Sequence, residues 1–334
     1  MRVLVGDIGG TNARLALVER VRTGRGWSVL EERHFPSQEY EGLVPVLKEF
    51  LAGASPSGRP PERAVLGVAG PVSGGKGRLP NRGWLVDEEE IVREVEVSDV
   101  RVLNDFQVIG YALPTLSRDD LFEVHAGSAS PPEDHPPIAL IGAGTGLGQG
   151  FLVWNGVRYE VHPSEGGHAE FAPRTPTELG LLEHLWETHS RVSCEDVVSG
   201  RGLVNLYRYF LARDPGREND ATRRAIEEGD PPKVIVERAL AGSDSICESA
   251  LDLFVSAYGA QAGNVALTVR AAGGVYLAGG IAPAITDRLR SGGFVRAFKD
   301  KGPLSELVAR IPVRVILDTR VGLRGAMAIA GTDF

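Results

Sequence analysis

A glycine-rich turn near the N-terminus is the first feature that could do chemistry. The string Gly9-Gly10-Thr11-Asn12 separates two apolar, strand-like runs, residues 2–6 and 13–19, and this pattern predicts a β-hairpin. Glycines let backbone N–H groups approach an anion, and Thr11 and Asn12 add side-chain donors. Asp7 ends the first strand and is a candidate for Mg²⁺, held through water because Mg²⁺ retains its waters. An ordinary hairpin turn is the alternative.

A second turn of the same kind lies near the middle of the chain. The string GAGTGLG, residues 142–148, separates strand-like runs at 138–141 and 150–154. Two such hairpins could hold one triphosphate, and their similarity suggests duplication of one supersecondary unit. We exclude a dinucleotide-binding motif because no G-x-G-x-x-G is present and a strand follows. We also exclude a P-loop at residues 70–76, because Gly77 stands where Ser or Thr should bind magnesium.

Polar residues that could bind and activate a sugar lie between and after the two turns. Asp105 follows a short strand beside Asn104 and could accept the proton of a sugar hydroxyl during phosphoryl transfer. A turn or a helix cap is the alternative use of this pair. Glu165 and His168 flank two glycines and supply the acceptors and donors that a sugar site needs, unless they lie in a surface loop. Glu195 taken alone fits a solvated or helix-capping acid better than a ligand.

Two weaker candidates complete the set. Asn81 and Trp84, in the string LPNRGW, could face a cleft, although Trp84 fits the core better. His162 and His168 have no Cys or Asp partner at a spacing suited to zinc, so we do not expect a zinc site.

The elements that must position these residues follow from hydrophobic periodicity and from glycine and proline. Further strands are expected at residues 64–69, 101–103, 275–277 and 313–317. Helices are expected at 42–52, 87–95 and 246–272, with a glycine- and alanine-rich terminal helix from Gly322. Loops are expected at 53–63 and at the proline-rich 128–137, which is a plausible domain junction. Residues 212–232 are charged and expected to be exposed.

Bulk composition favours a two-domain protein of the cytoplasm. A chain of 334 residues is too long for one compact core. Its net charge of −8 excludes a globally basic surface for nucleic acid. Cys194 and Cys247 are far apart and indicate no disulfide framework. No signal peptide and no run of 18 apolar residues is present, so we expect no membrane association.

Five motifs follow one another along the chain: DIGGTNAR from Asp7, NDF from Asn104, GAGTGLG from Gly142, EGGH from Glu165 and AGGI from Ala278. In this order they resemble bacterial glucokinases of the hexokinase superfamily, over nearly the whole chain. Each motif alone is moderately specific, whereas the ordered set is highly specific.

The resemblance implies a fold, a reaction and a site. The fold would be α/β, the two-domain actin-like ATPase (ribonuclease H-like) fold with an interdomain cleft. The small domain would hold residues 1–114 plus 319–334, and the large domain residues 115–318. The reaction would be ATP-dependent phosphorylation of glucose at its 6-hydroxyl, with Mg²⁺, in a homodimer.

The same resemblance implies roles for individual residues. Asp105 would be the catalytic base. The residues that would bind glucose are Asn104, Asp105, Glu165, His168 and Glu195, with Asn81 a weaker candidate. The residues that would bind the nucleotide are Gly6, Asp7, Ile8, Gly9, Gly10, Thr11, Asn12, Thr145 and Gly146, with Gly279 and Gly280 near the adenosine.

Three alternatives remain open on the residues. A kinase for another hexose would keep the same site. An actin-like nucleotide switch would need no sugar-binding Glu and His, and a catalytically silent sugar sensor would not need Asp105. The related sugar-responsive repressors usually carry a cysteine-rich zinc motif, which this chain lacks, and its first strand begins at once without a DNA-binding segment. We therefore do not expect a repressor.

Overall fold

The computed structural model describes residues 1–21, 26–54, 59–79, 82–127 and 134–332. Its contacts divide the chain into two units. Unit 1 contains Met1–Ser117, Tyr159–Pro163 and Asp318–Phe334, and unit 2 contains Arg118–Arg158 and Ser164–Leu317. The sequence-based boundaries did not assign residues 159–163 to the first part of the chain, and the interdomain cleft stays a prediction.

Unit 1 is built on a five-stranded sheet in the order β3-β2-β1-β4-β8. Its strands are β1 (Arg2–Ile8), β2 (Asn12–Arg20), β3 (Trp27–Pro36), β4 (Arg63–Val68) and β8 (Asp99–Asn104). β1 runs antiparallel to β2 and parallel to β4, and β4 runs parallel to β8. The expected hairpin around Gly9-Gly10 is thus confirmed.

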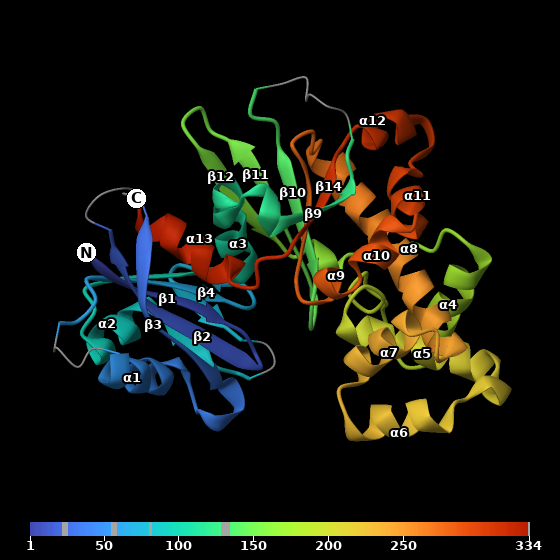
Figure 1. Cartoon of the computed structure of the whole chain (residues 1–334), viewed down its shortest axis with the longest axis horizontal. Helices are drawn as coiled ribbons and strands as arrows, with labels where there is room; N and C mark the ends of the chain where they lie inside the picture. The colour runs from blue at the N-terminus through green and yellow to red at the C-terminus, as the bar shows by residue number, and fades with distance from the viewer. Residues whose placement is uncertain (22–25, 55–58, 80–81, 128–133, 333–334) are drawn as a thin grey trace. The chain divides into compact units, whose positions relative to one another are not determined.

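Helices cover both faces of this sheet because side chains along a strand alternate between its faces. These helices are α1 (Leu43–Ala54), α2 (Glu88–Val95), α3 (Asp105–Ala112) and α13 (Val321–Ala330). Leu4 and Ile8 of β1 lie in one apolar cluster with residues of α1 and α2, whereas Val3 and Val5 lie in another with residues of α3 and α13. Figure 1 shows α13 beside α3. The terminal helix therefore completes the layer behind β1.

Two smaller features belong to unit 1. A three-stranded sheet contains β5 (Val72–Ser73), β6 (Lys76–Arg78) and β7 (Leu85–Asp87). β5 and β6 form a hairpin over the GPVSGGK string, so the rejection of a P-loop is confirmed. β12 (Tyr159–Ser164) brings Val161 against α3, where Gly110 leaves room for it.

Unit 2 repeats the strand pairing of unit 1. Its strands are β9 (Leu121–His125), β10 (Ile138–Ala143), β11 (Leu147–Trp154), β13 (Gly274–Ala278) and β14 (Val313–Ile316). β10 runs antiparallel to β11 and parallel to β13, β13 runs parallel to β14, and β9 closes the edge antiparallel to β14. The same hairpin-plus-parallel-strand unit thus occurs twice, as the two glycine turns suggested.

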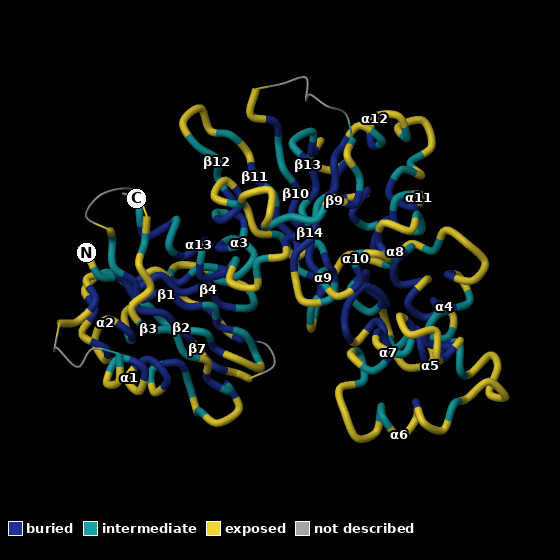
Figure 2. Tube along the Cα trace, viewed as in Figure 1, coloured by how far each residue is buried: buried dark blue, intermediate teal, exposed yellow. Residues whose placement is uncertain are grey.

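Helix α8 (Ser245–Val269) is the buried axis of unit 2. The other helices of this unit are α4 (Pro176–Trp186), α5 (Gly200–Arg213), α6 (Asp220–Glu228), α7 (Pro231–Leu240), α9 (Ile281–Ala284), α10 (Thr286–Arg290), α11 (Gly293–Lys299) and α12 (Ser305–Ala309). α8 packs on α5, α7 and α11. The buried colour in Figure 2 follows α8 and the strands of the sheet, whereas α6 is largely exposed. Within the described residues, no helix has the length and apolar character needed to cross a bilayer.

Candidate functional site

The first glycine turn is held from behind by Ser37, which is fully buried. The Gly9 amide donates to the Asn12 carbonyl at 2.9 Å, the Ser37 amide donates to the Thr11 carbonyl at 2.9 Å, and the Ser37 hydroxyl donates to the Gly9 carbonyl at 2.9 Å. The side chains of Thr11 and Asn12 are exposed. This support therefore occupies the carbonyls of Gly9, Thr11 and Asn12, whereas the side chains of Thr11 and Asn12, which carry donors, are exposed.

Asp7 is a half-buried carboxylate next to this turn. It lies opposite Arg14 in the β1–β2 ladder, and its side chain makes no hydrogen bond to another described residue. A Cβ at Gly322 would lie 2.6 Å from Asp7 Oδ2, so the glycine at the start of α13 makes room for the carboxylate. Burial raises the pKa of Asp7, and Arg14 offsets part of that rise. A buried carboxylate without a hydrogen bond suits a cation.

Gly6 and Ile8, two other predicted residues of unit 1, have apolar surroundings. A Cβ at Gly6 would touch Leu66 at 2.7 Å and Leu15 at 2.9 Å, and Ile8 is fully buried. Their side-chain positions thus belong to the core, and any nucleotide contact would have to come from their backbone. Asn81 lies outside the described residues. Trp84 is 4% exposed and lies in the core, as expected.

Asn104 and Asp105 lie where β8 meets α3. Asn104 caps the helix: its Oδ1 accepts from the Gln107 amide at 3.1 Å, and its Nδ2 donates to the Gly70 carbonyl at 3.0 Å. Asp105 is the first residue of α3, and its Oδ1 accepts from the Phe106 amide at 2.9 Å. The helix cap considered as an alternative is therefore present, and it fixes the direction of both polar side chains.

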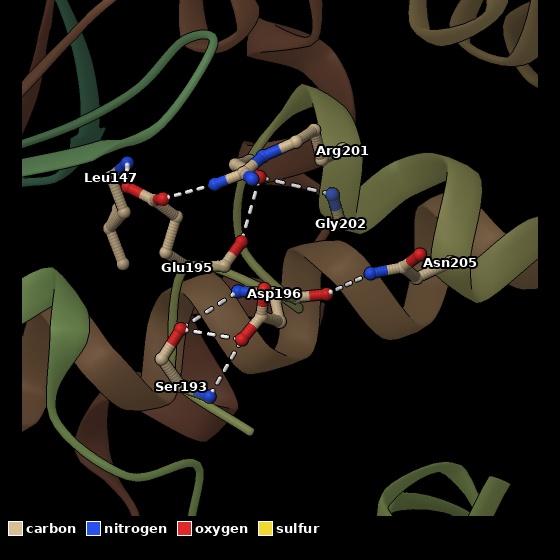
Figure 3. Close-up of polar contacts among 8 residues, drawn as sticks. Leu147, Ser193, Glu195, Asp196, Arg201, Gly202 and Asn205 are labelled. Carbon is tan, nitrogen blue, oxygen red and sulfur yellow. Dashed lines mark hydrogen bonds and ion pairs between the residues drawn. The ribbon is translucent and has the colours of Figure 1, made fainter. Parts of the chain in front are cut away.

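In unit 2, the second turn lies against Glu195 (Figure 3). The Leu147 amide, directly after Gly144-Thr145-Gly146, donates to Glu195 Oε2 at 2.8 Å. A Cβ at Gly146 would overlap that carboxylate, so glycine is required for the close approach. The second carboxylate oxygen, Oε1, pairs with Arg201. Glu195 is thus neither a solvated acid nor a cap, since it connects the turn to α5.

The segment around Glu195 is rigidly held. Asp196 Oδ2 accepts from the Ser193 amide at 2.9 Å and from its hydroxyl at 2.7 Å, and Asn205 Nδ2 donates to the Asp196 carbonyl at 2.9 Å. Ser199 is the N-cap of α5: its hydroxyl accepts from the Gly202 amide at 3.0 Å and donates to the Glu195 carbonyl at 2.7 Å. These bonds fix the Glu195 backbone.

Glu165 and His168 are exposed on a short 3-10 turn, Gly166–His168. Gly167 lies so close to the Leu147 carbonyl that a Cβ would overlap it, and the Glu195 amide donates to the Gly167 carbonyl at 2.9 Å. Among the described residues, the side chains of Glu165 and His168 form no hydrogen bond and no ion pair. The turn therefore brings Glu165, His168 and Glu195 to one place in unit 2.

A pocket of about 660 Å³, here called the α7 pocket, opens beside the second turn. It is lined by Thr145 of the turn, by Gly280 after β13, and by apolar side chains of α7 and α9, Pro232, Val236, Leu240, Ile281 and Ala284. Its size and apolar wall suit an aromatic base, since ligand pockets are mostly apolar with few polar groups. Gly279 has φ +82°, and a Cβ there would overlap the Ala143 carbonyl, which explains the glycine.

Sequence reasoning did not identify Arg201 and Lys233, which also line the α7 pocket. The one available signal was Ser199-Gly200-Arg201-Gly202, a helix start with a cation in its first turn, where the helix dipole disfavours positive charge.

The family model and the curated relatives that match this chain point to one family. The sequence profile of the glucokinase family matches residues 4–333 of this chain. A glucokinase from Nostoc sp. is 41% identical over an alignment of 341 residues, which covers 98% of this chain and 98% of that protein. The chain belongs to the glucokinase family. Members of this family phosphorylate glucose with ATP, so the expected family and enzyme class are confirmed.

Solved glucokinase structures share the fold. One from an Antarctic psychrotroph has a TM-score of 0.80 and 32% identity, with 98% of each chain covered. A ROK family glucokinase from Streptomyces griseus, in complex with glucose and AMPPNP, has a TM-score of 0.69 and 20% identity, with 98% of this chain and 99% of that chain covered. The α/β, two-domain actin-like ATPase fold predicted from the motifs is therefore confirmed.

The described part of the chain gives little support for a metal site built from protein ligands alone or for a reactive cysteine. No group of three or more His, Cys, Asp or Glu residues there could hold a metal ion by itself. Cys194 and Cys247 are buried and unpaired with each other, and burial raises the pKa of the Cys194 thiol to about 11. That thiol stays protonated at neutral pH and is a poor nucleophile.

Proposed function

We propose that this chain transfers the γ-phosphoryl group of ATP to the 6-hydroxyl of glucose, with Asp105 as the general base. The full-length match to the glucokinase family carries this proposal. Phosphoryl transfer depends mainly on positioning and on electrostatic stabilisation, and a base that accepts the hydroxyl proton aids the attack.

Asp105 is proposed as the base because of how α3 holds it. One carboxylate oxygen, Oδ1, accepts from the Phe106 amide, which orients the side chain at the first residue of the helix. A helix N-terminus stabilises the ionised form of a carboxylate, the form that can accept a proton. Asn104, fixed by the same cap, would contribute an amide hydrogen to a sugar hydroxyl.

Glu165, His168 and Glu195 are proposed to bind the other hydroxyls of glucose. Glu165 and His168 have side chains that make no bond to the described protein, and the Glu195 amide ties its segment to Gly167 between them. A sugar needs several fixed acceptors and donors, because an unpaired buried hydroxyl costs free energy. Two carboxylates and one imidazole on a shared support meet that need.

The two glycine turns and the α7 pocket are proposed to bind ATP. Gly9, Gly10, Thr11, Asn12, Thr145 and Gly146 would contact the phosphates, with Gly6, Asp7 and Ile8 in the same segment. Gly279 and Gly280 would lie near the adenosine, since Gly280 lines the α7 pocket with its apolar wall. Asp7 fits Mg²⁺, because Mg²⁺ takes one or two carboxylates together with waters and substrate phosphates. When bound, Mg²⁺ would neutralise phosphate charge.

A coupled ADP-release assay with Asp105→Asn tests the proposal. The amide keeps an Oδ1 acceptor for the Phe106 amide, so the helix start is preserved. We expect kcat to fall by about 10²–10⁴-fold while glucose still binds, since a positioned base contributes about that much. Asp287→Asn, a change at an exposed acid on α10, is the matched control and should keep full activity. Near-normal turnover of Asp105→Asn would rule out Asp105 as the base.

The same assay with a panel of hexoses decides between glucose and another sugar. Glucose is expected to have the highest kcat/KM; a higher value for mannose or fructose would reassign the substrate. We also propose that the protein acts as a homodimer in the cytoplasm. Light scattering should then give about twice the chain mass of 35.7 kDa, whereas a monomer mass would contradict the dimer.

A further inference from the structure

The ion pair between Glu195 and Arg201 connects the proposed sugar site to the α7 pocket. The Glu195 side chain is 12% exposed and both of its oxygens are engaged, Oε2 by the Leu147 amide at 2.8 Å and Oε1 by Arg201. Figure 3 shows the guanidinium reaching from the start of α5 to the carboxylate. A sugar hydroxyl that needs Glu195 Oε1 therefore competes with Arg201.

Arg201 also faces the α7 pocket. It lines that pocket with Thr145 and Lys233, and its side chain is 65% exposed. Among the described residues, Glu195 is the one hydrogen-bond partner of its guanidinium. The Gly200 amide donates to the Gly144 carbonyl at 2.8 Å, which fastens the start of α5 to the phosphate-binding turn. Arg201 thus contacts the Glu195 carboxylate and lines the α7 pocket from a helix start that is bonded to the second glycine turn.

A triphosphate is the stronger partner for this guanidinium. Its charge exceeds that of one carboxylate, and the planar fork of arginine matches phosphate oxygens with two parallel hydrogen bonds. The Glu195 pair is mostly exposed on the arginine side, and such pairs are weak. An anion in the α7 pocket would therefore draw Arg201 away from Glu195.

We propose that Arg201 is a positioning residue that exchanges Glu195 for the phosphates of ATP, and so frees Glu195 Oε1 to accept a hydroxyl of glucose. The exchange makes ATP tighten the binding of glucose, and by linkage glucose tightens the binding of ATP to the same degree. This inference rests on the proposed function, because it requires Glu195 to bind the sugar and the α7 pocket to bind the nucleotide.

Calorimetric titration of glucose, with and without saturating AMPPNP and Mg²⁺, tests the exchange. In the unmodified protein we expect AMPPNP to lower the Kd of glucose about fivefold, the low end of the usual coupling range, because the pair is exposed. In Arg201→Gln, glucose alone should bind more tightly than in the unmodified protein, and AMPPNP should no longer change its Kd. Arg201→Lys should keep part of the coupling, because it retains the charge but not the fork.

Arg208→Gln is the matched control. Arg208 is exposed on the same helix and does not line the α7 pocket, so the fivefold coupling should persist. Coupling in Arg201→Gln equal to that in Arg208→Gln would overturn the inference. Weaker binding of glucose alone to Arg201→Gln would also overturn it, because Arg201 would then support Glu195 in its sugar-binding position.

Turnover of the unmodified protein distinguishes a failure of the proposed function from a failure of the Arg201 partner exchange. If the unmodified protein does not phosphorylate glucose, the proposed function fails. If it does, and Arg201→Gln retains the coupling, only the partner exchange fails. Glu195→Gln adds a further check. The glutamine side chain can still accept from the Leu147 amide, but it forms no ion pair with Arg201. Adding Arg201→Gln to the Glu195→Gln variant should therefore no longer change the effect of AMPPNP on the Kd of glucose.

Discussion

Asp7 is a residue whose surroundings conflict with its charge. Its pKa is raised by burial in the layer between β1 and α13, and Arg14 compensates only in part. The pKa of Asp7 is therefore higher in the native state than in the unfolded chain, and at a pH between these two pKa values the native state binds the Asp7 proton more tightly. The contribution of Asp7 to stability accordingly falls as pH rises through that window. At neutral pH the ionised carboxylate lowers the free energy of unfolding.

Asp7→Asn should therefore stabilise the fold and impair the enzyme. We expect a higher free energy of unfolding than in the unmodified protein at pH 7, and a difference that shrinks toward zero as the pH falls below the ordinary range for Asp. Turnover should fall at the same time if Asp7 helps bind Mg²⁺. Urea unfolding between pH 4 and pH 8 measures the first effect. A destabilised variant at pH 7 would show that the carboxylate has a stabilising partner instead.

At the level of single residues, the sequence could predict the type of group but not its partners. Asp105 and Asn104 were recognisable as a polar pair after a strand, and both the helix cap and the proposed site use the same two side chains. Glu195 looked like a solvated acid because its neighbours, Leu147 and Arg201, come from different elements. Only the folded chain brings these groups together, so no local pattern could reveal the ion pair.

At the level of elements, the contact between α8 and α11 depends on glycine. A Cβ at Gly259 would overlap the backbone of Phe294, so the two helices touch at this position without an intervening side chain. The sequence predicted a long helix at 246–272 but did not indicate this contact.

Gly259→Ala should separate α8 from α11. Although alanine has the higher helix propensity, the overpacking should lower the free energy of unfolding by about 1–3 kcal/mol. Gly42→Ala is the matched control, since nothing lies within 4 Å of a Cβ there and its φ is not positive. Chemical denaturation of both variants measures the difference. Equal stability would mean that α11 moves aside without loss of packing.

Elements with a clear period were predicted well, and those without one were not. Both glycine hairpins, α2 and α8 begin within a few residues of the expected positions. α3 was missed because its buried residues, Val108, Gly110 and Ala112, alternate by two, which is the spacing of a strand. Its helical form depends on the Asn104 cap and on packing against α13. Within 212–232, α6 is largely exposed, as expected, although Thr222 is buried.

On the scale of the whole molecule, the repeated sheet explains why one chain can present two glycine turns. Each unit ends its central strand, β1 or β10, at a glycine turn that leads into an antiparallel partner. The parallel neighbours β4 and β13 end at the same edge of each sheet, and glycines, Gly70 and Gly279, follow them closely. Binding sites in α/β sheets form at the carboxyl ends of such strands. The order of the motifs along the chain was therefore more informative about the fold than any single motif.

Ligand binding should stabilise the whole chain in a way that distinguishes the three functional classes. Glucose at 100 times its Kd should raise the free energy of unfolding by about 2.7 kcal/mol, because it binds only the native state. L-glucose at the same concentration is the control, since it has the same composition and the opposite handedness. Thermal unfolding with each sugar measures the effect. Asp105→Asn should keep the stabilisation by D-glucose while losing turnover. A nucleotide switch would show no response to D-glucose, and a silent sensor would respond without turnover even in the unmodified protein.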